Sequence, residues 1–278
     1  ADALPAGAAW DASVPPDWVR LSGLLPPGPI GLAAWEHEAA SVRAALARVY
    51  ASALLDADSM ANVLQETVDV QIPVDARLCR ITGRIGGVFA MAENSLGRIL
   101  LRMYPAKGEM KSEADLHFGE RVSLFLDWAL LRLHSADTVP VRPLLLCKGD
   151  SPWQDSLTRW DAEFRDADGA QQKQLRADLE GRVAGLLSRW QQAEIQPPLY
   201  FVRTSWAAAQ DADAHNPGKA QKVWHSGHNK SGEHAHGQGY NLLLAGDIDF
   251  ETDAKAFQAL HAFARELNAL ISFPELQA

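Results

Sequence analysis

The chain has 278 residues, of which 47 % are apolar and 22 % are charged. This ordinary globular composition is long enough for one large domain or two small ones, and no apolar run approaches the ~20 residues that span a bilayer. We therefore expect a soluble protein without a membrane partner. The net charge of −9 argues against strong nucleic-acid binding by the chain alone, because phosphates are neutralised by cations; a local basic patch within a larger assembly stays compatible with it.

Two features of the sequence bear on its cellular setting. The only cysteines, Cys79 and Cys147, are too few for a disulfide framework and lie in apolar, strand-like runs, so the cytoplasm is the expected compartment. The N-terminus lacks an initiator Met and the layout of a signal peptide. Residues 1–9 are typical of a cut point, and we expect a fragment of a longer protein.

The first 30 residues are rich in Pro, Gly and Ala, with proline pairs at 15–16 and 26–27. Such pairs favour extended backbone, so residues 1–30 are predicted to form an extended N-terminal segment and residues 31–278 the main domain. After Gly31, apolar residues recur at steps of three and four, which predicts a long amphipathic helix. Its apolar positions are Leu32, Trp35, Ala39, Val42, Leu46, Val49 and Ala53.

A strand-rich region follows. Residues 68–74, 78–91 and 97–104 are predicted strands, with Glu93-Asn94-Ser95 as the turn of a hairpin between the last two. A helix with Phe118 and Leu133 on its apolar face comes next, and then a strand at 141–148. This order predicts an α/β fold, a mixed sheet flanked by helices.

The C-terminal part is predicted to be mainly helical. A helix spans about 170–193 and ends before Pro197-Pro198, residues 199–202 are extended, and Thr204 or Ser205 caps a turn at 206–210. Residues 211–239 have no hydrophobic period and predict a long loop. A strand at 240–245 and a helix through 257–271 complete the chain.

The predicted loop contains four histidines, His225, His228, His234 and His236. Imidazole is a common metal ligand, but Glu233 is the only carboxylate nearby and the stretch is rich in glycine. A catalytic metal needs rigidly held ligands. The usual interpretation of such a stretch is a solvated polar loop, and we predict no metal site and no cofactor.

The hairpin at 80–104, followed by a helix and a strand, has the layout of a restriction-endonuclease-like nuclease core. That chemistry needs an Asp ending the first strand, then an acidic residue, a spacer and a Lys on the second, because carboxylates hold Mg²⁺. The RecB-type branch has Gly-x-Ile-Asp and Asp-Tyr-Lys; here Gly83-Arg84-Ile85 is followed by Gly86, and Arg102-Met103-Tyr104 stands at the second motif. A cation at 102 would repel Mg²⁺. On these residues alone, a plain hairpin without nuclease ancestry is an equal alternative.

Several short stretches together resemble one family, the C-terminal domain of exodeoxyribonuclease V gamma (RecC) subunits. The resemblance covers about residues 25–278; only the histidine-rich surroundings of Gly232-Glu233 depart from it. The stretches that carry it are 25–31, 81–85, 100–105 with Lys107, 121–133, 141–146, 198–201 and 240–250. In the helix, Arg121 and Phe125 stand where an active nuclease has Gln and Tyr.

The resemblance implies an inactive, RecB-type nuclease fold that scaffolds a RecBCD-type helicase–nuclease complex. Such a domain lies where duplex DNA enters, helps to split the strands and contacts RecB-like and RecD-like helicase subunits. The expected partners are therefore those subunits and double-stranded or forked DNA. Recognition of a recombination hotspot would lie in upstream domains that are absent here.

The densest basic group lies on and beside the hairpin and forms the predicted DNA-binding set. Its cations are suited to phosphates and its tyrosine to base stacking, although a charged hairpin face is more often simply solvated. Trp153 and Trp160 are weaker candidates for an aromatic wedge. The predicted set is Arg84, Arg98, Arg102, Tyr104, Lys107 and Lys111.

Three hypotheses stay open on the sequence. The first is a non-catalytic, DNA-guiding scaffold. The second is a divergent metal-dependent nuclease or hydrolase that uses the loop between His225 and His236. The third is a generic protein-interaction module that shares only the fold.

Overall fold

The computed structural model describes residues 14–51, 64–91, 96–104, 116–147, 162–164, 166–225, 232–236 and 248–272. The chain divides into two compact units. Unit 1 comprises residues 1–68, 83–115 and 135–166, and unit 2 comprises residues 69–82, 116–134 and 167–278. The predicted boundary at residue 30 stays a prediction.

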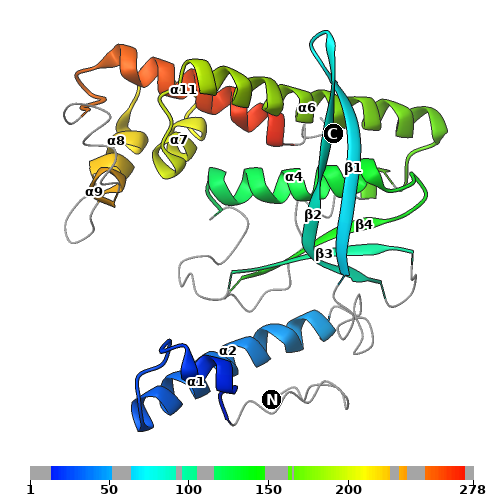
Figure 1. Ribbon diagram of the computed structural model, residues 1–278. Helices are drawn as coiled ribbons and strands as arrows, with labels where there is room; N and C mark the ends of the chain where they lie inside the picture. Colours follow the sequence, from blue (N-terminus) through cyan, green and yellow to red (C-terminus); the bar gives the residue numbers. More distant parts are fainter. Residues whose placement is uncertain are drawn as a thin grey trace. The chain divides into compact units, whose positions relative to one another are not determined.

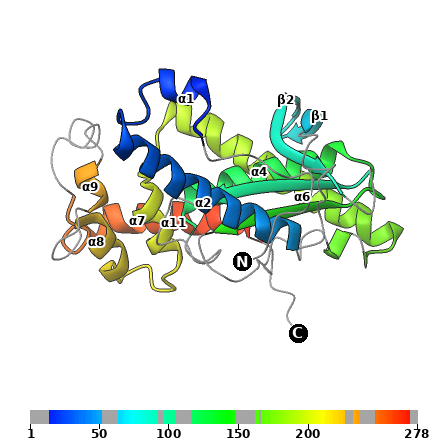
Figure 2. The ribbon, with the colours of Figure 1, turned by 90° about the horizontal axis from the view of Figure 1, so that it is seen from below.

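The sheet contains four strands in the order β1-β2-β3-β4. β2 pairs with β3 in the antiparallel sense and β3 pairs with β4 in the parallel sense, so the predicted mixed α/β architecture is confirmed. The strands are β1 (Leu64–Val74), β2 (Arg77–Ala90), β3 (Arg98–Tyr104) and β4 (Val141–Cys147). The helix that precedes the sheet, α2 (Pro29–Ala51), lies in the same unit and approaches β4 (Figure 2).

β1 and β2 are long, and each has one face that avoids solvent. In β1 the alternate residues Val68, Val70, Ile72 and Val74 are buried, as the period of two of a half-buried strand requires. A two-residue turn joins the strands, and its first residue, Asp75, has φ of 51°. Asp tolerates this left-handed backbone better than a β-branched residue would.

One segment departs from the extended conformation predicted for residues 1–30. A short helix, α1 (Asp17–Leu21), lies within it. The Ser22 hydroxyl donates to the carbonyl of Val19 at 2.9 Å, which satisfies one of the acceptors that the end of α1 leaves open. Helix α2 begins at Pro29, where a proline suits the first helical turn.

Unit 2 is built mainly from helices. They are α4 (Phe118–His134), α6 (Gly169–Ile195), α7 (Val202–Ala209), α8 (Gly218–His225), α9 (Glu233–His236) and α11 (Ala254–Ile271). α6 starts with a capping box, in which the Asp168 carboxylate accepts from the main-chain N–H of Ala170 and Gln171 and the Gln171 side chain accepts from Asp168. The fully buried aromatic side chains of unit 2 include Trp128, Trp224 and Phe257.

α6 and α11 pack side by side (Figure 1). Gly185 of α6 permits this, because a Cβ at that position would lie 2.7 Å from Leu270 of α11. Nearby, the guanidinium of Arg182 donates to main-chain oxygens of Ala269 and Ser272 at the end of α11, where a cation opposes the helix dipole favourably.

The long loop predicted for residues 211–239 is wrong where the structure describes it, because α8 and α9 lie there. Figures 1 and 2 show both helices gathered with α7 near the start of α11. Trp224 is the reason: it is 1 % exposed and its ring lies 4.3 Å from that of Phe201 and 6.0 Å from that of Phe250. One buried aromatic thus orders a segment whose other residues show no hydrophobic period.

Candidate functional site

The candidate site is the β2–β3 hairpin in unit 1, at a kink formed by two glycines. The regular ladder runs from Ala90–Arg98 to Val88–Leu100. Gly87 comes next, with φ of +65°, and a Cβ there would lie 2.9 Å from the carbonyl oxygen of Leu101. Only glycine accommodates this backbone and this close approach of the strands.

Arg102 lies just beyond the last regular pair of this ladder. Its Nη1 donates to the carbonyl oxygen of Gly86 and to that of Leu101, each at 2.9 Å. A Cβ added to Gly87 would lie 3.0 Å from the same Nη1. The guanidinium therefore provides a donor to oxygens of both strands beside the kink.

Arg98 is also engaged by the protein. Its Nε lies 3.1 Å from Oε1 of Glu66 in β1, and both side chains are about three-quarters buried. Its Nη1 donates to the carbonyl oxygens of Leu96 and Gly97, at 2.8 and 3.3 Å. Because Arg98 and Arg102 are four residues apart on β3, they lie on one face of the strand. Glu66 is the partner that the sequence pattern did not reveal.

The other predicted DNA-binding residues divide into two groups. Arg84 lies exposed on β2, two residues before Gly86. The backbone of Tyr104 ends β3, but its side chain, like Lys107 and Lys111, lies outside the described residues. The structure thus brings Arg102 to Gly86, with Arg84 close along the strand; the DNA-binding role of the whole set stays a prediction.

The hairpin does not fit a divalent metal ion. Gly86 and Arg102 stand at the two positions that the predicted nuclease layout assigns to carboxylates, and Nη1 of Arg102 lies 2.9 Å from the carbonyl oxygen of Gly86. A guanidinium is cationic at every accessible pH, so it repels Mg²⁺ rather than binding it. Within the described ranges, no group of three or more His, Cys, Asp or Glu side chains is placed to hold a metal.

The α4 positions singled out in the sequence belong to unit 2 and take structural roles there. Phe125 is fully buried. The guanidinium carbon of Arg121 lies 4.1 Å from the centre of the Trp206 ring, a cation–π geometry, while its Nε donates to the carbonyl of Leu116 at 2.8 Å.

The histidine-rich segment uses its described polar groups to bind main-chain atoms. Nδ1 of His234 lies 2.8 Å from the carbonyl oxygen of Trp224, and the rings of His225 and His234 are 5.2 Å apart. His228 and the side chain of His236 lie outside the described residues. The arrangement of His225 and His234 therefore favours a structural contact between α8 and α9.

Glu233 caps α7 from a distant part of the sequence. Its carboxylate accepts from the main-chain N–H of Arg203 and Thr204 and from the Thr204 hydroxyl, at 2.7 to 3.1 Å. The residue at the N-cap position, Phe201, has no side-chain acceptor. Thr204 and Ser205, predicted to cap a later turn, lie inside α7 instead; the Ser205 hydroxyl accepts from the N–H of Phe201 at 3.0 Å.

Gly232, beside Glu233, is required by a close backbone approach. A Cβ at Gly232 would lie 2.0 Å from the carbonyl oxygen of Trp224. The sequence marks the Gly232-Glu233 pair, but gives no sign of this packing or of the cap on α7.

Among the described residues, the carboxylates of Asp69 and Asp249 have lowered pKa values. The pKa of Asp69 lies below its ordinary value, chiefly because it accepts hydrogen bonds from the Arg80 guanidinium at 2.6 and 2.8 Å, with smaller help from the charges of Arg80 and His134. The pKa of Asp249 is lowered mainly by the N–H of Glu251, 3.0 Å from Oδ1. Both carboxylates are surface groups, so neither marks an acid–base centre.

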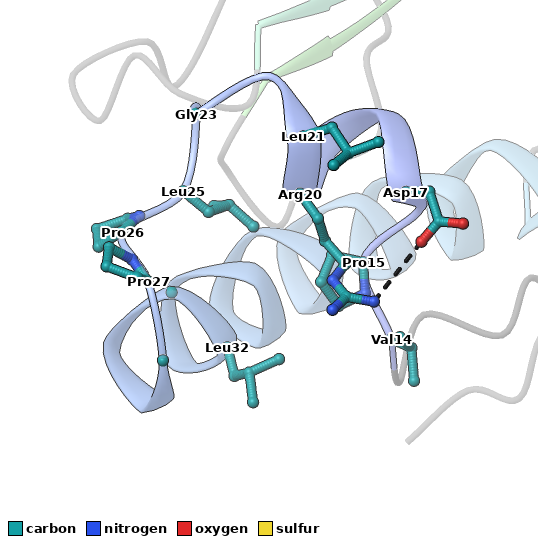
Figure 3. Close-up of a pocket in the computed structure, with 12 residues that line it drawn as sticks. Val14, Pro15, Asp17, Arg20, Leu21, Gly23, Leu25, Pro26, Pro27 and Leu32 are labelled. Atoms are coloured by element: carbon teal, nitrogen blue, oxygen red, sulfur yellow. Dashed lines mark ion pairs between the residues drawn. The ribbon is translucent and has the colours of Figure 1, made fainter.

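A pocket of about 940 Å³ lies among α1, the following turn and the start of α2 (Figure 3). Its lining is mostly aliphatic and proline, including Leu21, Leu25 and Leu32. Asp17 and Arg20 line it too and pair with each other at 3.6 Å. The pocket contains no group of side chains suited to catalysis.

Together these features define a mixed α/β protein in whose β2–β3 hairpin the guanidinium of Arg102 donates to two main-chain oxygens. The RecC C-terminal domain family matches residues 17–213, more than half of the chain. The chain belongs to this family, and the predicted family is confirmed; membership indicates a part in a RecBCD-type complex that acts on DNA. No curated protein and no solved structure gave a significant match. Among the described residues, none of the helices has both the length and the apolar character needed to cross a membrane.

Proposed function

We propose that this chain is a non-catalytic, DNA-guiding and scaffolding domain of a RecBCD-type helicase–nuclease complex in double-strand break repair and recombination. It helps to split duplex DNA in the cytoplasm and contacts RecB-like and RecD-like helicase subunits. The family supports the assignment to the complex. The restriction-endonuclease-like origin of the fold belongs to the same proposal and is supported by the order of α2, three strands, α4 and β4.

The observation that carries the non-catalytic role is the pairing of Arg102 with Gly86. Nη1 of Arg102 lies 2.9 Å from the carbonyl oxygen of Gly86, and neither residue supplies an acidic group. Phosphodiester hydrolysis by this class of nuclease needs bound Mg²⁺ to stabilise the attacking and leaving oxygens. A hairpin with a fixed cation at this point has no means of holding that ion.

Within the predicted DNA-binding set, Arg84 is the side chain best suited to contact phosphate. It is exposed, whereas Arg98 and Arg102 bind protein oxygens. Tyr104, Lys107 and Lys111 stay in the proposed set because they follow Arg102 closely in the sequence. Because the chain has a net charge of −9, this surface guides DNA that the other subunits hold and does not capture it alone.

The role in DNA guiding is tested by strand separation in the assembled complex. The matched variants are Arg84→Ala and Arg80→Ala, which remove exposed arginines from β2; Arg80 is already paired with Asp69. We expect Arg84→Ala to slow the unwinding of forked DNA about two- to fivefold at moderate salt, since an exposed charged contact contributes up to about 1 kcal/mol, and Arg80→Ala to have little effect. Equal unwinding by the wild type and Arg84→Ala would remove Arg84 from the proposal.

The absence of catalysis and the scaffolding role need two further measurements. The tagged chain, incubated with Mg²⁺ and linear duplex DNA, is expected to leave the DNA intact; cleavage that survives repeated purification would contradict the proposal. The same tagged chain is expected to capture the helicase subunits from a lysate of its own organism, identified by mass spectrometry. Capture of neither subunit, also after co-expression with both, would contradict the contact with this chain.

A further inference from the structure

The kink in β2 points to a further role for Arg102. The β2–β3 ladder is regular up to the pair Val88–Leu100. At the next positions the Gly87 backbone turns to φ of +65°, and the side chain of Arg102 donates to Gly86 and Leu101. A single guanidinium nitrogen therefore contacts one main-chain oxygen of each strand.

We propose that the guanidinium of Arg102 is a permanent substitute for the divalent ion of a nuclease centre, and that it holds the kinked strands together in place of that ion. The proposal rests on the proposed non-catalytic function. A hard cation such as Mg²⁺ joins oxygen ligands from neighbouring strands, and Arg102 here joins two oxygens as a donor. With the Arg102 side chain in place of an ion, this position has a structural role instead of a catalytic one.

The chemistry of arginine explains why it can take this place. Its charge is permanent, and its planar donors have a fixed geometry, whereas lysine is a flexible point charge. The kink is then stable without any ion and insensitive to chelators. It depends on one side chain.

The glycines of β2 allow a direct test. A Cβ at Gly86 meets nothing within 4 Å, and the same holds at Gly83, so both positions accept a carboxylate. In the double variant Gly86→Asp with Arg102→Asp, two carboxylates stand on the neighbouring strands β2 and β3, at the residues that the contact between the Arg102 guanidinium and the Gly86 main-chain oxygen now joins. The matched control, Gly83→Asp with Arg102→Asp, has the same composition and charge, but its new carboxylate lies three residues earlier along β2.

The measurements use the full chain without DNA or partners, with Tb³⁺ luminescence sensitised by tryptophan and thermal unfolding in Mg²⁺ or EDTA. We expect the wild type to show no site-specific Tb³⁺ signal and the same Tm in both solutions. The 86/102 double variant gains Tb³⁺ binding and a Tm that Mg²⁺ raises, whereas the 83/102 control gains neither. Equal behaviour of the two double variants, or a Tm of the wild type that responds to Mg²⁺, would overturn the proposal.

A single variant tests the structural part separately. Arg102→Met removes two charged hydrogen bonds and should lower Tm by roughly 4 °C, whereas Arg84→Met should change it by less than about 1 °C. Arg102→Lys should fall between them. Equal Tm values for Arg102→Met and Arg84→Met would contradict the role of Arg102 as a bridge. Because no DNA or helicase subunit is present, failure here leaves the unwinding and capture experiments to judge the proposed function by themselves.

Discussion

The β2–β3 hairpin of unit 1 and the α7–α9 cluster of unit 2 use charged side chains in opposite senses. In the hairpin, the cation of Arg102 donates to main-chain carbonyl oxygens beside an interrupted ladder. In the cluster, the anion of Glu233 accepts from main-chain N–H groups at the start of α7. Regular secondary structure leaves such groups unpaired at its breaks and ends. In both regions a charged side chain forms hydrogen bonds with these main-chain groups. A charged residue that could be taken for part of a catalytic site therefore has a structural role instead.

The two regions also share a glycine that makes this completion possible. Gly87 lets Arg102 approach the kink, and Gly232 lets the chain pass the carbonyl of Trp224 just before Glu233. They differ in how much space surrounds each glycine. Substitutions at these positions therefore rank the two regions by the stability that each one contributes.

Gly232→Ala should have the largest effect. The added Cβ would lie 2.0 Å from the carbonyl oxygen of Trp224, a backbone atom that cannot move away without displacing α8. We expect the free energy of unfolding, measured by urea denaturation, to fall by at least about 3 kcal/mol. Gly181→Ala, in the middle of α6 where nothing lies within 4 Å, is the matched control and should be neutral or stabilising by about 0.5–1 kcal/mol.

Glu233→Ala should follow, because it leaves donors at the start of α7 without their acceptor. Glu233 is 9 % exposed and Thr204 is fully buried, so water replaces the lost bonds poorly. The expected loss is about 2 kcal/mol of unfolding free energy. Glu251→Ala, an exposed carboxylate, serves as the control. An equal loss for both variants would show that Glu233 does not cap α7.

Gly87→Ala should lower the free energy of unfolding by about 2 kcal/mol or slightly less. Part of the strain arises within the backbone of residue 87 itself. Alanine at φ of +65° is unfavourable by about 1–2 kcal/mol, and a Cβ 2.9 Å from the main-chain oxygen of Leu101 forces a backbone shift that adds to this cost. Gly83→Ala, in open space on the same strand, should be neutral in the same urea titration. If the two variants unfold alike, the kink is not required by the fold.

The sequence predicted the strands and long helices of the described residues well because their signals are local; the strand predicted at 240–245 lies outside the described residues. The alternation of Val68, Val70 and Ile72 and the helical period from Phe118 to Leu133 need only neighbouring residues to be recognised. The positions of Gly86 and Arg102 as counterparts were also predictable, since a hairpin places such residues opposite each other.

The remaining features depend on contacts between residues distant in the sequence. Glu233 caps a helix that begins about 30 residues earlier, and Glu66 binds Arg98 from another strand. No pattern within a helix or strand encodes either contact. The histidine-rich segment was predicted to be a loop because its order comes from one buried side chain, Trp224, and not from a repeated apolar face.

We expect the smallest effect on stability from the pair of Asp69 and Arg80, which lies on the surface of the β1–β2 hairpin. The hydrogen bonds from Arg80 lower the pKa of Asp69 in the folded state. A lowered folded-state pKa contributes stability above the unfolded value of about 3.9, and that contribution is lost as the pH falls through the folded-state pKa. The wild type should therefore exceed Asp69→Asn slightly in urea midpoint at neutral pH, and the difference should shrink as the pH falls below the unfolded value of about 3.9. Arg80→Met should remove the same pH-dependent difference, and the double variant should add nothing to it. A difference in urea midpoint that persists at low pH would mean that Asp69 contributes through packing. The pair of Asp69 and Arg80 would then not act through its charge, unlike Arg102 and Glu233.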